Sequence, residues 1–152
     1  MPTDMKRIFI KRTEVRILEL IIATGNSRKA KFWKNTKISW DDLVKRLSDT
    51  TRTGETQGEY TNMTKAQQDE IKDVGGFVGG KVRDGRRNAG SIEYRTLLTL
   101  DADYASADFC DDMTLFFGYT YCIYSTHKHS TEKPRLRMVI PLSRPCTPDE
   151  YE

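Results

Sequence analysis

The sequence TLLTLDAD, from Thr96 to Asp103, is an apolar, β-prone run that ends in two carboxylates. It predicts a buried strand with a charged C-terminal end. Side chains alternate between the two faces of a strand, so Asp101 and Asp103 point the same way and lie close enough to share a cation. Two neighbouring carboxylates repel each other unless a metal ion, a proton or a cationic group lies between them. We therefore expect a divalent ion, Mg²⁺ or Mn²⁺, held for phosphate chemistry; the alternative is a solvated strand end or a helix N-cap, since acid-x-acid patterns also occur by chance.

The composition is that of one globular domain. The chain has 152 residues, of which 37% are hydrophobic and 31% charged, and a chain of this length can bury a core. No apolar run is long enough to span a bilayer and the first residues do not form a secretory signal, so we expect no membrane partner. The three cysteines are an odd number at wide spacings, which favours a reducing cytoplasm over a disulfide framework.

Positive charge is concentrated at the front of the chain. Residues 1–46 carry 12 Lys/Arg and 5 Asp/Glu, a net charge of +7, against −4 for the remainder, which together give +3. Within this basic front, residues 28–35 alternate cations with two aromatic rings, a combination that holds single-stranded nucleic acid through phosphates and stacked bases. The alternative places the rings in the core and leaves the cations solvated. The nucleic-acid-binding candidates here are Arg28, Lys29, Lys31, Phe32, Trp33 and Lys34.

The first half of the chain predicts one strand and two capped helices. β-Branched residues favour a strand within Lys6–Gly25. Ser39 and Asp42 form a capping box for a short helix, and Thr64 with Gln67 forms another for a helix that reaches Asp73. Between these helices, residues 49–61 are almost free of apolar side chains and predict a long loop.

The second half predicts a sheet with helices against one face. Residues 75–88 are rich in glycine and arginine and favour a hairpin that leads into the central strand. The arginines of its turn, Arg83, Arg86 and Arg87, lie beside the carboxylates or are solvated. A helix over 106–117 with Gly118 as its C-cap has an apolar stripe, and strands follow at Tyr119–Tyr124 and Leu136–Leu142. Thr147 begins a helix only one turn from the last residue, and one turn is too short to be stable alone. We therefore expect this chain to be the front of a longer protein.

Two strand ends are expected to meet. If the strands on either side of helix 106–117 run parallel, their C-terminal ends lie at one edge of the sheet; if they are antiparallel, His127 is far from the carboxylates. In the parallel case Asp101 and Asp103 meet Ser125, His127 and Lys128, which supply donors for phosphate oxygens. Carboxylates for metal beside cations for phosphate are what nucleotidyl transfer requires.

The same residues resemble a known family. LDAD at 100–103 followed by YSTH at 124–127 resembles the first two motifs of the archaeo-eukaryotic primase superfamily, hydrophobic-Asp-x-Asp/Glu and Ser-x-His at a strand end. KDVGGFVGG at 72–80 and PRLRMVIPLSRP at 134–145 resemble the primase-polymerase regions of phage and prophage replication proteins, which often precede a helicase or a virulence-associated E type ATPase domain.

The resemblance implies a fold and an activity. The fold is α+β, a mixed sheet with helices packed against it around an RNA-recognition-motif-like catalytic core at about 75–152. The activity is metal-dependent primer synthesis on single-stranded DNA from nucleoside triphosphates. Asp101 and Asp103 are the implied metal ligands and, with His127, the catalytic residues. The implied nucleotide-binding residues are Ser125, His127, Lys128, Arg135 and Arg137.

One part of the family pattern is missing. The third motif, an acidic residue on a later strand, has no counterpart after His127, so the fragment alone is expected to bind metal poorly or to be inactive. Three alternatives remain: a non-catalytic single-strand-binding module, a rolling-circle relaxase-like endonuclease that uses His127 and His129, and a structural zinc site. The zinc candidates are Cys122, His127, His129 and Cys146.

Overall fold

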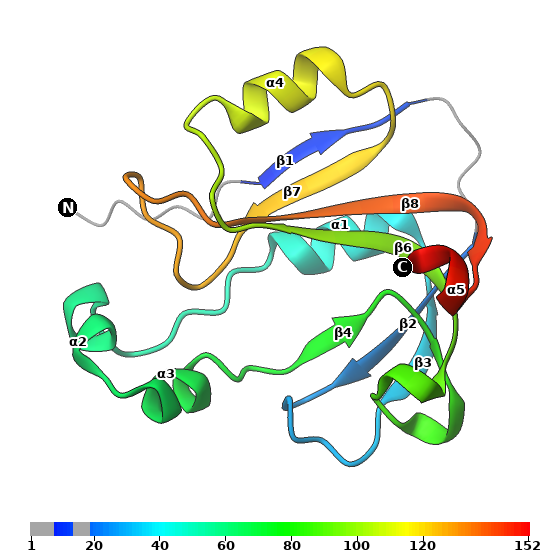
Figure 1. Cartoon of the computed structure of the whole chain (residues 1–152), viewed down its shortest axis with the longest axis horizontal. Helices are drawn as coiled ribbons and strands as arrows, with labels where there is room; N and C mark the ends of the chain where they lie inside the picture. Colours follow the sequence, from blue (N-terminus) through cyan, green and yellow to red (C-terminus); the bar gives the residue numbers. More distant parts are fainter. Residues whose placement is uncertain (1–7, 14–18) are drawn as a thin grey trace.

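The computed structural model describes residues 8–13 and 19–152, which form two sheets flanked by helices (Figure 1). The larger sheet has the strand order β1-β7-β8-β6-β5 and the smaller one the order β3-β2-β4. The strands are β1 Ile8–Lys11, β2 Leu20–Gly25, β3 Lys34–Ile38, β4 Gly76–Val78, β5 Gly80–Val82, β6 Ile92–Ala102, β7 Tyr121–Ser125 and β8 Leu136–Cys146. The helices are α1 Trp40–Ser48, α2 Gln57–Asn62, α3 Lys65–Ile71, α4 Phe109–Phe116 and α5 Pro148–Tyr151, with 3₁₀ turns at Arg83–Gly85 and Ala89–Ser91.

The expected α+β class is confirmed. Each hydrogen-bonded strand pair within the described residues is antiparallel, so the larger sheet is not mixed in its pairing. β6 and β7 nevertheless run in the same direction, because both pair antiparallel with β8, which lies between them. With α4 as the connection, β6 and β7 form a split β-α-β unit.

Alternation along the central strands supplies two apolar layers. Cys122 and Val139 face α1 and β2, whereas Ile123 and Met138 face α4. In Figure 1, α4 accordingly lies on one side of the larger sheet, and α1 with the smaller sheet lies on the other. Leu43 of α1 is fully buried in the first layer.

The two sheets are joined where the chain passes from β4 to β5. A Cβ on Gly80 would lie 2.2 Å from the carbonyl oxygen of Tyr94, so this crossing of β6 requires glycine. Gly80 is opposite Arg95 in β6, and the next residue of that strand is the buried Thr96. The Thr96 hydroxyl donates to the carbonyl of Ile21 at 2.8 Å and accepts from the Ile21 amide at 3.2 Å. A side chain of the larger sheet thus takes the place of a backbone partner for β2.

Two predicted helices are confirmed, and one helix lies where a loop was predicted. Ser39 accepts from the amide of Asp42 at the start of α1, and Thr64 forms its box with Gln67 at the start of α3. α2 begins inside the segment 49–61 and ends one residue beyond it, because Thr56 and Glu59 make a further capping box. The loop prediction was wrong over these residues because it weighed apolar content and not the cap.

Other local predictions need correction. The single strand expected within Lys6–Gly25 is two strands in different sheets, β1 and β2; residues 6, 7 and 14–18 of that prediction lie outside the described residues. Gly118 is not a left-handed C-cap, since α4 ends at Phe116 and the extended Phe117 follows as the cap.

The single turn of α5 is held by contacts outside itself. Thr147 and Glu150 form a capping box, and Arg144 pairs with Glu150, which lowers the pKa of that carboxyl to about 2. The guanidinium of Arg95 lies 4.0 Å from the centre of the Tyr151 ring. No helix among the described residues has the length and apolar character needed to cross a membrane.

We predict that Thr96→Val destabilises the domain by about 1–3 kcal/mol, because the amide and carbonyl of Ile21 lose their buried side-chain partner at nearly unchanged volume. Urea unfolding measures the change in the free energy of unfolding. Thr36→Val, at an exposed position of β3, is the matched control and should have a much smaller effect. Equal effects of the two variants would show that Thr96 does not join the sheets.

Candidate functional site

The C-terminal ends of β6 and β7 meet at one edge of the larger sheet, as the parallel case required. In the strand register Arg137 of β8 is opposite Asp101 of β6 on one side and Tyr124 of β7 on the other. Directly opposed residues point to the same face. These three side chains therefore form a row on the face that carries α1.

Both carboxylates of the motif are paired with arginines. The Arg137 guanidinium donates twice to Asp101, from Nε at 2.7 Å and from Nη2 at 3.2 Å. Arg135, two residues earlier in the chain, lies 3.2 Å from Asp103. The Arg135–Asp103 pair lies directly beyond the last register pair, Ala102 and Leu136, so the four side chains form two adjacent ion pairs, which we call the arginine–carboxylate ladder. The cationic partner that the carboxylate pair requires is thus supplied by the protein itself.

The ladder is half-open to solvent, so its ions remain exchangeable. Asp101 and Asp103 are each 54% exposed, against 39% for Arg137 and 33% for Arg135. Ion pairs at such exposure are each worth about 1 kcal/mol or less. Hydrogen bonding to Asp101 raises the pKa of Arg137 further above its ordinary value. Burial raises the pKa of Tyr124, whose hydroxyl also bonds Arg137, so the phenol stays neutral.

The donor set fits a Mg²⁺ or Mn²⁺ ion that brings its own further ligands. Such ions are held through one or two carboxylates, with water and substrate phosphates completing the coordination. Asp101 and Asp103 supply the two carboxylates. Within residues 8–13 and 19–152 no group of three or more His, Cys, Asp or Glu side chains is arranged to hold a metal, so the two carboxylates lack a third protein ligand there.

His127 lies just beyond β7 and is held by the segment before α2. Its Nε2 is 3.1 Å from Oε1 of Glu55 and 3.2 Å from the Thr53 hydroxyl. The Tyr60 ring packs on the imidazole with 4.5 Å between centroids. The Glu55 side chain is only 9% exposed, and its pKa is lowered, first by the hydrogen bond from Thr53 and also by His127. The imidazole is therefore fixed at Nε2 beside an ionised carboxylate.

The remaining polar residues after β7 have different surroundings. Lys128 is exposed, and its ammonium lies 6.0 Å from the centre of the Tyr60 ring. His129 accepts the Arg135 amide at its Nδ1, 3.2 Å away, and so shapes the turn between β7 and β8. Ser125 is opposite Leu136, which is opposite Ala102. The Ser125 side chain therefore lies on the α4 face and is not brought together with the ladder.

The zinc alternative is not supported by the geometry. Cys122 is buried within β7, opposite Val139, whereas Cys146 ends β8 seven residues further on. The described residues contain no metal-binding cluster that includes them.

The candidates for nucleic-acid binding divide into two groups. Arg28 lies 3.5 to 3.9 Å from three acids of the α3 region, and Lys29 pairs with one of them, Glu70. Trp33 is 2% exposed and belongs to the core, so the alternative reading holds for this ring. Exposed positions remain for Lys31, Phe32, Lys34, Arg83, Arg86 and Arg87.

The three arginines of the β5–β6 turn do not lie beside the carboxylates. β5 pairs with the beginning of β6, where Val82 is opposite Ile92. Nine residues of extended strand separate Ile92 from Asp101, which is roughly 30 Å. The turn is therefore at the other end of the sheet.

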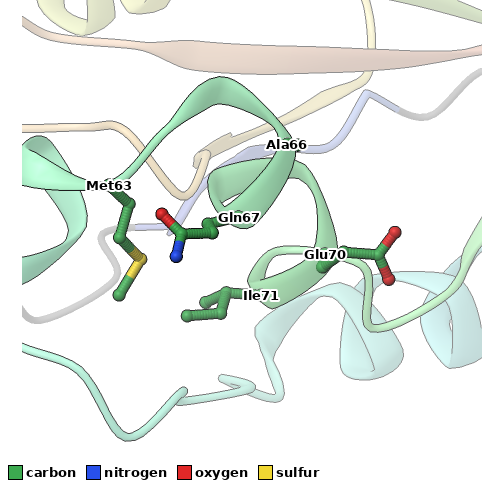
Figure 2. Close-up of a pocket in the computed structure, with 5 residues that line it drawn as sticks. All are labelled: Met63, Ala66, Gln67, Glu70 and Ile71. Atoms are coloured by element: carbon green, nitrogen blue, oxygen red, sulfur yellow. The ribbon is translucent and has the colours of Figure 1, made fainter.

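Figure 2 shows a pocket lined by side chains of α3 and by Met63, which lies just before this helix. Its volume is about 340 Å³ and its lining residues are Met63, Ala66, Gln67, Glu70 and Ile71. No residue of the ladder lines it, so it does not extend the candidate site.

Sequence reasoning missed the partners of His127. Thr53, Glu55 and Tyr60 all come from the stretch predicted to be a loop. The signal was the box Thr56-x-x-Glu59, which starts α2 and places Tyr60 on its inner side. No sequence pattern indicated that this helix lies against the β7 end, because the contact is between segments more than 60 residues apart.

The comparisons with known proteins give the family. A model of the VapE N-terminal domain matches residues 8–152. The chain belongs to this family. Membership agrees with the expected relation to virulence-associated E type replication proteins of phages and related elements. No curated protein and no solved structure shows significant similarity to the chain.

We predict that Glu55→Ala loosens the α2 segment and frees the imidazole of His127, because Nε2 loses its charged partner. Amide hydrogen exchange should accelerate across residues 53–60, and the His127 ring resonances should shift in NMR spectra. Glu132→Ala, at an exposed position of the β7–β8 turn, is the control and should leave that exchange unchanged. Unchanged exchange in Glu55→Ala would refute the role of this contact.

Proposed function

We propose that this VapE N-terminal domain is a primase-polymerase type nucleotidyltransferase that synthesises primers on single-stranded DNA with Mg²⁺ or Mn²⁺. The observation that carries the proposal is the shared edge of the larger sheet. There the acid-x-acid end of β6, the start of β8 and the His127 turn after β7 lie together. The family relation to replication proteins supports the same reaction class.

The ladder residues divide the work between cation and phosphate. Asp101 and Asp103 would hold the divalent ion, which would lower the pKa of the primer 3′-hydroxyl and neutralise phosphate charge. Arg135 and Arg137 would bind triphosphate oxygens, for which the planar guanidinium is well suited. When the carboxylates bind the metal ion and the arginines bind phosphate, each charged group would exchange its partner in the ladder for a ligand of opposite charge. No carboxylate or guanidinium would then be left unpaired.

His127 would complete the phosphate site from β7. Glu55 and Thr53 already lie beside Nε2, so Nδ1 is the ring nitrogen that would contact a phosphate oxygen. Lys128 adds an exposed ammonium in the same turn. These groups would stabilise the negative charge that develops on the departing pyrophosphate.

A non-catalytic single-strand-binding module is the second candidate. The observation that favours it is the ladder itself, since both carboxylates are neutralised without any metal. In that case the aspartates only fix the end of β6 to β8. The two candidates differ in what happens to the carboxylates when metal and nucleotide are supplied.

We predict that Asp101→Ala or Asp103→Ala abolishes metal-dependent incorporation of labelled nucleotide by a protein that carries this domain. In the 152-residue chain itself, calorimetry should show that Arg137→Gln binds Mn²⁺ more tightly than wild type, because Asp101 no longer has a competing cation. The same variant should bind a nucleoside triphosphate more weakly.

Asp111→Ala, an exposed carboxylate on α4, is the matched control and should change neither activity nor Mn²⁺ affinity. Near-normal incorporation by the Asp101/Asp103 double alanine variant, with the fold intact by circular dichroism, would refute the enzyme. Reduced Mn²⁺ affinity in Arg137→Gln would show that the arginine supports the carboxylates and does not compete for them.

A further inference from the structure

Two segments far apart in the sequence form one surface at the end of the sheet opposite the ladder. The amide of Trp33 donates to the carbonyl of Gly85 at 2.8 Å. The Asn35 side chain bonds both backbone groups of Val82, at 2.8 and 3.0 Å. Arg87 lies 4.9 Å over the Trp33 ring. The basic loop before β3 and the arginine turn after β5 are thus fixed to each other.

Four cations of this surface are exposed and have no carboxylate partner among the residues that the structure describes. They are Lys31, Lys34, Arg86 and Arg87. Asp84 lies in the same turn as the arginines, and Glu93 is bound by Lys81 at 2.9 Å. By contrast, Arg28 and Lys29 are neutralised by the acids around α3. The surface therefore has the excess positive charge that a polyanion requires.

An aromatic ring lies among these cations. Phe32 is 67% exposed, although a ring of this size is usually buried. It rests on Gly85, where a Cβ would come within 2.3 Å of the ring and where the backbone φ is +65°. Glycine is thus required both for the turn and for the contact with the ring. Phe32 is positioned by the backbone while much of its surface remains available.

We propose that this surface, formed by Lys31, Phe32, Lys34, Arg86 and Arg87, binds single-stranded nucleic acid. Phe32 stacks on a base and the four cations contact backbone phosphates, a combination suited to strands whose bases are unpaired. That the partner is the single-stranded template rests on the proposed function. The positive charge and the exposed Phe32 ring are features of the structure and do not depend on that proposal. The surface lies roughly 30 Å from the carboxylates, the length of about nine stacked nucleotides. It therefore holds template outside the reaction site.

The salt dependence of binding tests the phosphate contacts. A fluorescently labelled oligodeoxythymidine is titrated with the 152-residue chain at several KCl concentrations, without divalent metal or nucleotide. Each lost phosphate contact lowers the slope of log K against log [salt] by about 0.7. Lys31→Gln/Arg86→Gln should therefore lower the slope by about 1.4. Lys45→Gln/Arg46→Gln, which removes the same charge from the exposed side of α1, should leave it unchanged.

A second pair of variants tests the ring. Phe32→Ala should weaken binding about fivefold or more without changing the salt slope, because stacking involves no counterion release. Phe116→Ala is the matched control, since this ring is 82% exposed on α4 at a distance from the surface. It should bind as tightly as wild type.

Three results would overturn the proposal. One is an unchanged slope in the folded Lys31→Gln/Arg86→Gln variant, and another is equal loss of affinity in the two phenylalanine variants. The third is binding to phosphatidylserine vesicles that depends on Phe32, with no binding of the oligonucleotide. Since no metal or nucleotide is present, failure here leaves the Mn²⁺ tests of the ladder standing, and failure of those tests leaves strand binding standing.

Discussion

The position of β8 between β6 and β7 is the constraint on which the candidate site depends. Both outer strands pair antiparallel with β8, so they run in the same direction and end at the same edge. β8 begins at that edge and contributes its first side chains there. Were β6 and β7 direct antiparallel neighbours, His127 would lie at the opposite end from Asp101, and the two motifs could not act together.

The same arrangement explains the electrostatics of the site. Asp101 of β6 is opposite Arg137 of β8, and Asp103 pairs with Arg135 just beyond the ends of these two strands. The ladder satisfies the charges without burying them, which keeps the cost of separating them low. A site built in this way is stable when empty and can still exchange its ions for ligands of matching charge. His127 is held in a comparable way, since its Nε2 lies 3.1 Å from Glu55 while the side chain remains 30% exposed.

Local features of the fold could be predicted from the sequence, whereas long-range placement could not. The caps at Ser39 and Thr64 and the strand that ends at Asp101 follow from short patterns. The break between β1 and β2 did not, because β-branched residues occur on both sides of it and only pairing with different sheets separates them. Gly118 was expected to end α4 through a left-handed conformation, but the chain leaves the helix in an extended one.

The candidate site shows the same division. Alternation predicted that Asp101 and Asp103 share a face, and the structure shows each carboxylate paired with an arginine at the beginning of β8 or just before it. The arginine partner of Asp101 and the opposite orientation of Ser125 depend on strand register, which the sequence alone does not specify. Glu55 lies beside His127 because the α2 segment packs against the end of β7, which is a long-range contact. The merging of the two basic segments likewise depends on the backbone contact of Trp33 with Gly85.

The most direct test is a crystal structure of the chain with Mn²⁺ and a non-hydrolysable nucleoside triphosphate, with the metal located by its anomalous scattering. The account predicts an anomalous peak between Asp101 and Asp103, with Arg135 and Arg137 turned from the carboxylates to the phosphate oxygens. An intact ladder with the nucleotide bound elsewhere, or no ordered Mn²⁺ at these carboxylates, would contradict it.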